Sequence, residues 1–125
     1  MIIDSNLIIY AALPQYPGLR RFIAENKPAV SAISVVEVLG YHKLIENDRQ
    51  HYEAFFTATE ILPVSEAVVF KAVILRQARK MTLGDALIAA AGLVFERKLY
   101  THNTKDFIGI PGLEVIDPIA NGDPP

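Results

Sequence analysis

Four acidic residues, far apart along the chain, stand where a carboxylate could take part in chemistry. Asp4 comes directly after the apolar run Met1-Ile-Ile. The other three each follow a Ser, Thr or Asn by three positions: Ser34-Val-Val-Glu37, Thr82-Leu-Gly-Asp85 and Asn103-Thr-Lys-Asp106. Carboxylate oxygens are hard ligands of the kind that Mg²⁺ and Mn²⁺ prefer. If the four acids converge in the fold, this pattern indicates a metal site.

The elements that position these acids can be predicted from the spacing of apolar residues. Short apolar runs predict strands at 1–3, 29–32, 61–64, 99–101 and 113–116. Longer patterns predict helices at roughly 7–13, 17–26, 34–45, 48–59, 66–80 and 83–98, and a helical turn at 103–107. Strands that alternate with helices predict an α/β fold. We expect a single domain with a five-stranded, mainly parallel sheet flanked by helices.

This arrangement predicts where the acids lie. The carboxyl ends of parallel strands meet at one edge of a sheet, so Asp4, Glu37 and Asp106 should come together there. Asp85 follows two successive predicted helices, and the sequence alone does not fix its position. Two like charges about 4 Å apart repel by roughly 4 kcal/mol at an effective dielectric near 20. Converging carboxylates would therefore require a cation or bound protons.

Helix capping is the competing interpretation of the same acids. Ser34-Val-Val-Glu37 has the form of a capping box, in which the acid accepts a hydrogen bond from the backbone N–H of the cap residue. The motifs that end in Asp85 and Asp106 are weaker versions of it. Acids at helix N-termini also interact favourably with the helix dipole. Asp4 precedes no obvious long helix, and this favours the metal site.

Composition places the chain among globular proteins, with 125 residues, 51% of them hydrophobic and 21% charged. Its formal net charge of −2 argues against nucleic-acid binding by bulk charge, so a basic patch or a bound cation would be needed. The absence of cysteine excludes disulfides, thiolate zinc sites and cysteine nucleophiles. With no apolar stretch of membrane-spanning length, we expect a cytoplasmic protein without membrane contact. Residues 1–118 should form the domain, and 119–125 a flexible tail.

Taken in order, four motifs resemble those of the PIN domain: Ile3-Asp4-Ser5-Asn6, Ser34-Val-Val-Glu37, Gly84-Asp85-Ala-Leu-Ile-Ala-Ala90 and Thr101-His-Asn103-Thr-Lys-Asp106-Phe107. The resemblance covers nearly the whole chain, and a stand-alone domain of this length is similar to the VapC-type toxins of prokaryotic toxin–antitoxin pairs. It implies an endoribonuclease that hydrolyses RNA with Mg²⁺ or Mn²⁺. It also implies an antitoxin protein that blocks the site, and a homodimer. The catalytic, metal-binding positions implied are Asp4, Glu37, Asp85 and Asp106, with Ser5 and Asn103 in support.

Several other side chains are candidates for contacts with RNA. Lys105 lies inside the last motif, while Arg79 and Lys80 precede the Asp85 motif and could bind phosphates. The last two would equally suit the C-terminal dipole of the helix predicted at 66–80. Tyrosines can stack on bases, although they are more often core or interface residues. The tyrosines considered are Tyr10, Tyr16, Tyr41 and Tyr52.

Three other functions fit parts of the pattern. A PIN-type nuclease of RNA processing would have the same site without an antitoxin. A non-catalytic binding module would carry the acids as helix caps and bind no metal. A phosphoryl-accepting signalling domain of similar build is disfavoured, because Ile2 and Ile3 precede Asp4 where paired acids would be needed. That domain would also need a Lys after the last strand, and no Lys follows Lys105.

Overall fold

Five short parallel strands form the sheet, in the order β3-β2-β1-β4-β5. They are β1 (Ile2–Ile3), β2 (Ala29–Ser31), β3 (Ile61–Leu62), β4 (Leu99–Tyr100) and β5 (Val115–Ile116). The computed structural model, which describes residues 1–125, thus confirms the predicted α/β fold with its five-stranded parallel sheet. The central strand β1 pairs with both β2 and β4. Residues that follow these three strands are therefore neighbours at the carboxyl edge of the sheet.

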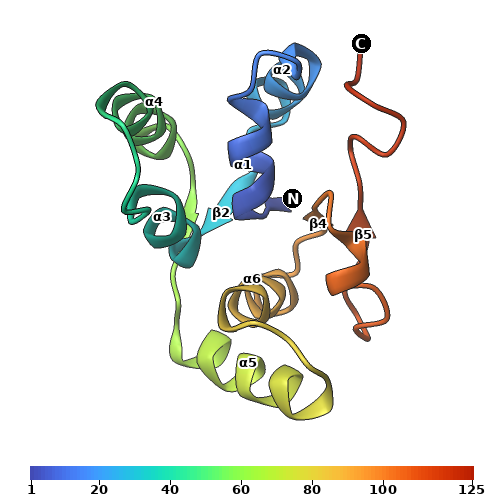
Figure 1. The fold of residues 1–125 in the computed structure, drawn as a ribbon. Helices are drawn as coiled ribbons and strands as arrows, with labels where there is room; N and C mark the ends of the chain where they lie inside the picture. Colours follow the sequence, from blue (N-terminus) through green and yellow to red (C-terminus); the bar gives the residue numbers. More distant parts are fainter.

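Six helices cover the two faces of the sheet (Figure 1). On one side lie α1 (Ser5–Ala11), α2 (Pro17–Asn26) and α4 (Glu46–Thr57), while α3 (Ala32–Leu39) contacts α1 and α4 of that side and also α6. On the other lie α5 (Glu66–Ala78) and α6 (Leu83–Val94), with α5 outside α6, and a 3₁₀ turn, η1 (Thr104–Asp106), follows β4. None of these helices combines the length and the apolar character needed to cross a bilayer.

The strands separate two hydrophobic cores. Ile2 and Ala29 belong to the core beneath α5 and α6, whereas Ile3 and Val30 belong to the core beneath α1 and α4. Successive side chains of a strand point to opposite faces, and here both faces are covered by helices. This burial on both faces explains why the strands are continuous apolar runs in the sequence.

Three predicted helix boundaries were clearly wrong: both ends of the helix predicted at 34–45, which spans Ala32–Leu39, and the end of the helix predicted at 83–98. One of them changes the interpretation of an acid. The helix predicted at 34–45 is α3, and its N-cap is Ser31, whose Oγ accepts a hydrogen bond from the N–H of Ile33. β2 therefore runs directly into α3, and Glu37 lies beyond its first turn, so Ser34-Val-Val-Glu37 is not a capping box. The helix predicted at 83–98 ends at Val94, and Glu96 soon after it has a left-handed backbone with φ 55°.

Asp123 ties the C-terminal segment to the start of α2. Its two carboxylate oxygens accept hydrogen bonds from the backbone N–H groups of Gly18 and Leu19, at 2.7 and 2.8 Å. The residue before α2 makes no side-chain cap hydrogen bond, so Asp123 supplies that cap from the far end of the chain. The residues predicted as a flexible tail, 119–125, begin with the buried Ile119 and return to α2. Their mobility stays a prediction, but their docking was not predicted.

We expect Asp123→Ala to lower the free energy of unfolding by about 0.5–2 kcal/mol, the usual effect of losing an N-cap. Asp123→Asn keeps an acceptor oxygen and should lose less. Urea denaturation measures both changes, with the exposed Asn121→Ala as the control. Equal stability of Asp123→Ala and the wild type would show that the tail does not cap α2 in solution.

Candidate active site

Asp4 is a buried carboxylate at the centre of the carboxyl edge of the sheet, with 3% of its surface exposed. Its Oδ1 accepts a hydrogen bond from the backbone N–H of Leu7 at 3.0 Å, so Asp4 caps α1, a role not predicted from the sequence. Its Oδ2 accepts a hydrogen bond from the hydroxyl of Thr101, after β4, at 2.5 Å. Burial raises the pKa of Asp4, although both hydrogen bonds act in the opposite direction.

Glu37 extends from α3 to contacts with α1 and α6. The Oγ of Ser5 lies 2.7 Å from Glu37 Oε1 and 2.9 Å from Ser34 Oγ. A hydroxyl has one proton, so Ser5 can donate to the carboxylate while it accepts from Ser34. On the α6 side, the carboxylate lies against Gly84, where an added Cβ would come within 2.5 Å of Glu37 Oε2. The absence of a side chain at Gly84 therefore makes room for Glu37.

Asp85 lies in the first turn of α6, next to Gly84. The Oγ1 of Thr82 caps this helix by accepting a hydrogen bond from the backbone N–H of Asp85 at 3.1 Å. Burial raises the pKa of Asp85, and the nearby charges of Asp106 and Glu37 raise it further, while a hydrogen bond from Thr82 opposes the shift. Asp85 is therefore both part of a capped helix start and electrostatically coupled to acids from two other elements.

The four acids predicted from the sequence share one electrostatic neighbourhood. The charges of Asp85 and Glu37 also raise the pKa of Asp4, so each acid is coupled to at least one other. None of the four forms an ion pair with a Lys, Arg or His. Oxygen-only donors and uncompensated negative charge are the chemistry of a Mg²⁺ or Mn²⁺ site. As the side chains lie, however, no three are gathered closely enough to hold an ion. Metal binding by these acids therefore stays a prediction.

The two supporting residues predicted from the sequence make different contacts. Ser5 contacts the carboxylate of Glu37 directly. The side chain of Asn103 makes no hydrogen bond, but its backbone N–H donates to the Oγ1 of Thr101 at 3.0 Å. This contact leaves the hydroxyl proton of Thr101 for Asp4.

Sequence reasoning missed two residues of this site. The sequence predicts Thr101 only as the last residue of the strand at 99–101 and assigns it no role, because its contact with Asp4 depends on the pairing of β1 with β4. Gly84 was quoted within a motif, and nothing in its local sequence reveals that Glu37 packs against it, because that contact joins α3 to α6.

The basic residues predicted to contact RNA are differently placed. Lys105 is exposed on η1, beside Asp106, and Lys80 is exposed after α5. The Nη1 of Arg79 instead donates a hydrogen bond to the carbonyl of Ile108 at 2.7 Å, which ties the end of α5 to the segment after η1. Arg79 therefore has a structural contact whether or not it meets RNA.

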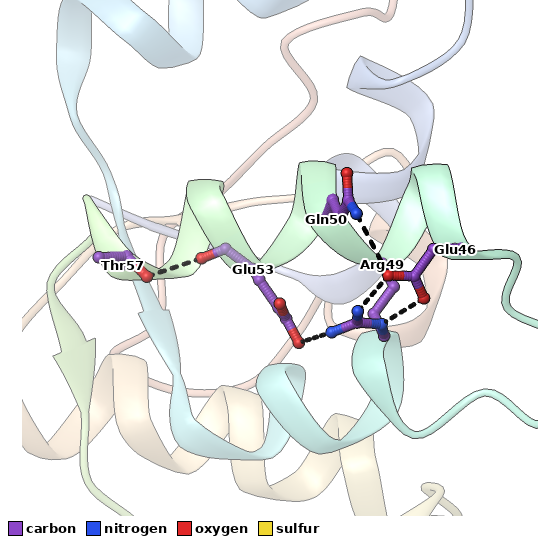
Figure 2. A network of polar contacts seen from close by, with 5 residues as sticks. All are labelled: Glu46, Arg49, Gln50, Glu53 and Thr57. Carbon is purple, nitrogen blue, oxygen red and sulfur yellow. Dashed lines mark hydrogen bonds and ion pairs between the residues drawn. The ribbon is translucent and has the colours of Figure 1, made fainter.

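A separate polar network covers the surface of α4 (Figure 2). Arg49 pairs with Glu46 and, at 2.5 Å, with Oε1 of Glu53, and Gln50 donates a hydrogen bond to Glu46 at 3.2 Å. Exposed pairs three or four residues apart on a helix contribute little to stability, because water and salt screen their charges. The network supports α4 and engages Arg49 with two carboxylates.

Comparison with solved structures finds this fold in toxin–antitoxin complexes. One from Klebsiella pneumoniae has 30% sequence identity and a TM-score of 0.76, over 94% of this chain and 96% of that one. VapBC2 from Rickettsia felis, bound to a promoter DNA fragment, has 25% identity and a TM-score of 0.74, over 91% and 95%. DNA-bound VapBC from Salmonella typhimurium, at 20% identity and a TM-score of 0.79 over 91% and 94%, shares the fold. No family sequence model matches the chain, and no curated protein matches it in sequence.

We expect Asp4→Asn to leave the metal-free protein as stable as the wild type, or more stable. Asn keeps an acceptor for the N–H of Leu7 and removes a buried charge, whereas Asp4→Ala removes the cap and should cost about 0.5–2 kcal/mol. A raised pKa means that the folded state binds the proton more tightly. Above that raised pKa the wild type carries the buried charge, so the difference in stability between Asp4→Asn and the wild type should be at its largest. As pH falls through the raised pKa, this difference should shrink.

Thermal melts of the wild type, Asp4→Asn and Asp4→Ala in chelator, across neutral to acidic pH, make this measurement. A loss of stability in Asp4→Asn as large as that in Asp4→Ala would contradict the interpretation of Asp4 as an unfavourable buried charge.

We expect Gly84→Ala to weaken metal binding without lowering the stability of the metal-free protein. Alanine within a helix is favoured over glycine by about 0.5–1 kcal/mol, and the new Cβ meets only the flexible end of Glu37, so the melting temperature should hold or rise. Displacement of that carboxylate should reduce the further stabilisation gained on adding Mg²⁺. Melts with Mg²⁺ and with chelator test this, and the exposed neighbour Leu83→Ala is the control. A full Mg²⁺ response in Gly84→Ala would show that Glu37 holds no metal.

Proposed function

This chain belongs to the VapC-like family of PIN-domain toxins, and from that premise we propose that it is a metal-dependent endoribonuclease that hydrolyses RNA phosphodiester bonds. The observation that carries this proposal is the electrostatic coupling of Asp4, Glu37, Asp85 and Asp106 at one edge of the sheet, without a protein cation to neutralise them. An acidic group of this kind would repel an RNA backbone unless a metal ion lay between them.

The four carboxylates would hold Mg²⁺ or Mn²⁺. Such an ion, when bound, activates a water molecule and neutralises charge that develops on the scissile phosphate. The contribution of the chain itself is largely orientation. Thr101 and the N–H of Leu7 fix both oxygens of Asp4, so this carboxylate is the most rigid of the four. Ser5 fixes only Oε1 of Glu37.

Proton transfer also needs an acceptor in the site. Burial and neighbouring acids raise the pKa of Asp85 in the metal-free protein, and a bound cation would act in the opposite direction. The proton from the attacking water would therefore go to a carboxylate oxygen that the ion leaves free. No nucleophilic side chain is required for this reaction.

We propose that this chain also has an antitoxin partner, because the solved structures that it matches are toxin–antitoxin complexes. In this proposal, a cognate antitoxin binds the protein and blocks access to the acids. The substrate is RNA, and the free toxin is a homodimer.

The outer face of α5 supports the homodimer. Four large apolar residues are between 42% and 60% exposed there: Val69, Phe70, Val73 and Ile74. Their spacing places them on one stripe of the helix, on the side away from α6. Exposed apolar patches of this kind mark interaction surfaces.

We expect purified protein to cleave a long structured RNA with Mg²⁺ or Mn²⁺, and to lose this activity in chelator. Asp85→Asn should lower the rate on the order of 100-fold or more, while Ser5→Ala, which only positions Glu37, should lower it roughly 10–100-fold. Gel analysis of RNA fragments gives the rates, and co-expressed antitoxin should suppress them. Absence of metal-dependent cleavage at high protein concentration would refute the nuclease proposal.

We expect Phe70→Glu to shift the protein from dimer to monomer, because a charge would enter the apolar stripe of α5. Light scattering after size-exclusion chromatography measures the mass. The exposed Asn47→Glu on α4 adds the same charge away from α5 and should remain dimeric. A wild type that is monomeric at high concentration would count against the dimer.

A further inference from the structure

A hollow of about 360 Å³ adjoins the acidic site and shares Glu37 with it. Its volume is at the low end for sites that take small molecules, which suits a single planar group better than a protein helix. The remaining lining comes from α1, from α3, from α4 and from the segment between α3 and α4. The lining residues used below are Ile9, Val38, Tyr41, Lys43, Asp48 and Tyr52.

Two tyrosines give this hollow its chemical character. Tyr41 is 54% exposed, so much of its side chain is free to meet a ligand. Tyr52 is only 7% exposed, and its hydroxyl makes no hydrogen bond within the protein. The structure contains no fully buried polar side-chain atom without a partner, so this hydroxyl keeps some exposed surface, and Tyr52 is one of the residues that line the hollow.

Polar groups accompany the aromatic ones. Burial and the nearby charge of Asp48 raise the pKa of Tyr52, which places a carboxylate acceptor near that hydroxyl. Lys43 adds a cation to the same lining, and Ile9 and Val38 add apolar surface. A small, largely apolar slot with a few polar groups is the usual form of a site that recognises a planar heterocycle.

We propose that this hollow binds one unpaired nucleobase of the RNA substrate, stacked on Tyr41, with its edge toward the Tyr52 hydroxyl and the Asp48 carboxylate and a flanking phosphate near Lys43. The proposal rests on the proposed ribonuclease function, and it assigns a nucleotide subsite beside the same acidic centre. Proteins that read single-stranded RNA stack its bases on aromatic side chains and bind the base edges by hydrogen bonds. Since Glu37 lines both places, a base held here would lie next to the backbone at the acids.

A fluorescence experiment tests the position directly. The chain has no tryptophan, so Tyr41→Trp introduces a single reporter. Phe95→Trp, at the end of α6 opposite to Asp85 and outside the hollow, is the matched control. Both are made in the Asp85→Asn background with Mg²⁺, so that a short single-stranded RNA of mixed sequence stays intact. We expect the RNA to quench Trp fluorescence at position 41 and leave position 95 unchanged, while the same sequence as a duplex has little effect at either.

Affinity measurements give the second readout. By fluorescence anisotropy of labelled RNA, Tyr41→Ala should weaken binding roughly 5- to 150-fold, the range for loss of one base–aromatic stack, while Tyr41→Phe should bind like the parent. Thermal melts confirm that each variant is folded. Unchanged RNA affinity in Tyr41→Ala would overturn the proposal, as would a reporter at position 41 that responds to the antitoxin but not to RNA.

Binding is measured without turnover, so the two proposals fail separately. Cleavage by the wild type, together with normal RNA binding by Tyr41→Ala, would refute the subsite and leave the nuclease function standing. Quenching at position 41 without any cleavage by the wild type would refute the nuclease function and leave the base-binding subsite standing.

Discussion

The buried charge of Asp4 is the constraint on which the rest of the site depends. A carboxylate at the centre of the sheet edge is desolvated, and the fold compensates with two hydrogen bonds, from the N–H of Leu7 and from Thr101. Those bonds join the start of α1 to the residue after β4, so the same contacts that satisfy Asp4 also hold two elements of the site in place. Because their effect is smaller than that of burial, the pKa of Asp4 remains raised.

The other acids are arranged around this fixed point by short connections. β2 runs into α3 with no intervening loop, and the contact between Ser5 and Glu37 joins α3 to the start of α1. On its other side Glu37 needs the space left by Gly84, which immediately precedes Asp85. Contacts between α1, α3 and α6 thus bring the carboxylates close together, and the cost of their mutual repulsion is what a bound cation would offset.

A capping role does not exclude an acid from the candidate metal site. Asp4 caps α1 and Asp85 lies in the capped first turn of α6, yet both have raised pKa values from burial and from their acidic neighbours. Glu37, whose motif looked most like a capping box, caps nothing. The sequence could not separate these cases, because a Ser–x–x–Glu pattern does not reveal where the preceding strand ends, and here Ser31 takes the role expected of Ser34.

The sequence by itself determined the α/β class, the number and parallel direction of the strands, and which acids follow them. These depend on apolar runs and on the common edge of parallel strands, both of which are local or topological properties. Tertiary structure alone decided where Asp85 lies, that Thr101 and Gly84 accommodate the acids, and that Asp123 caps α2. Each of these is a contact between residues distant in the chain, so it depends on how helices pack and not on any spacing that the sequence displays.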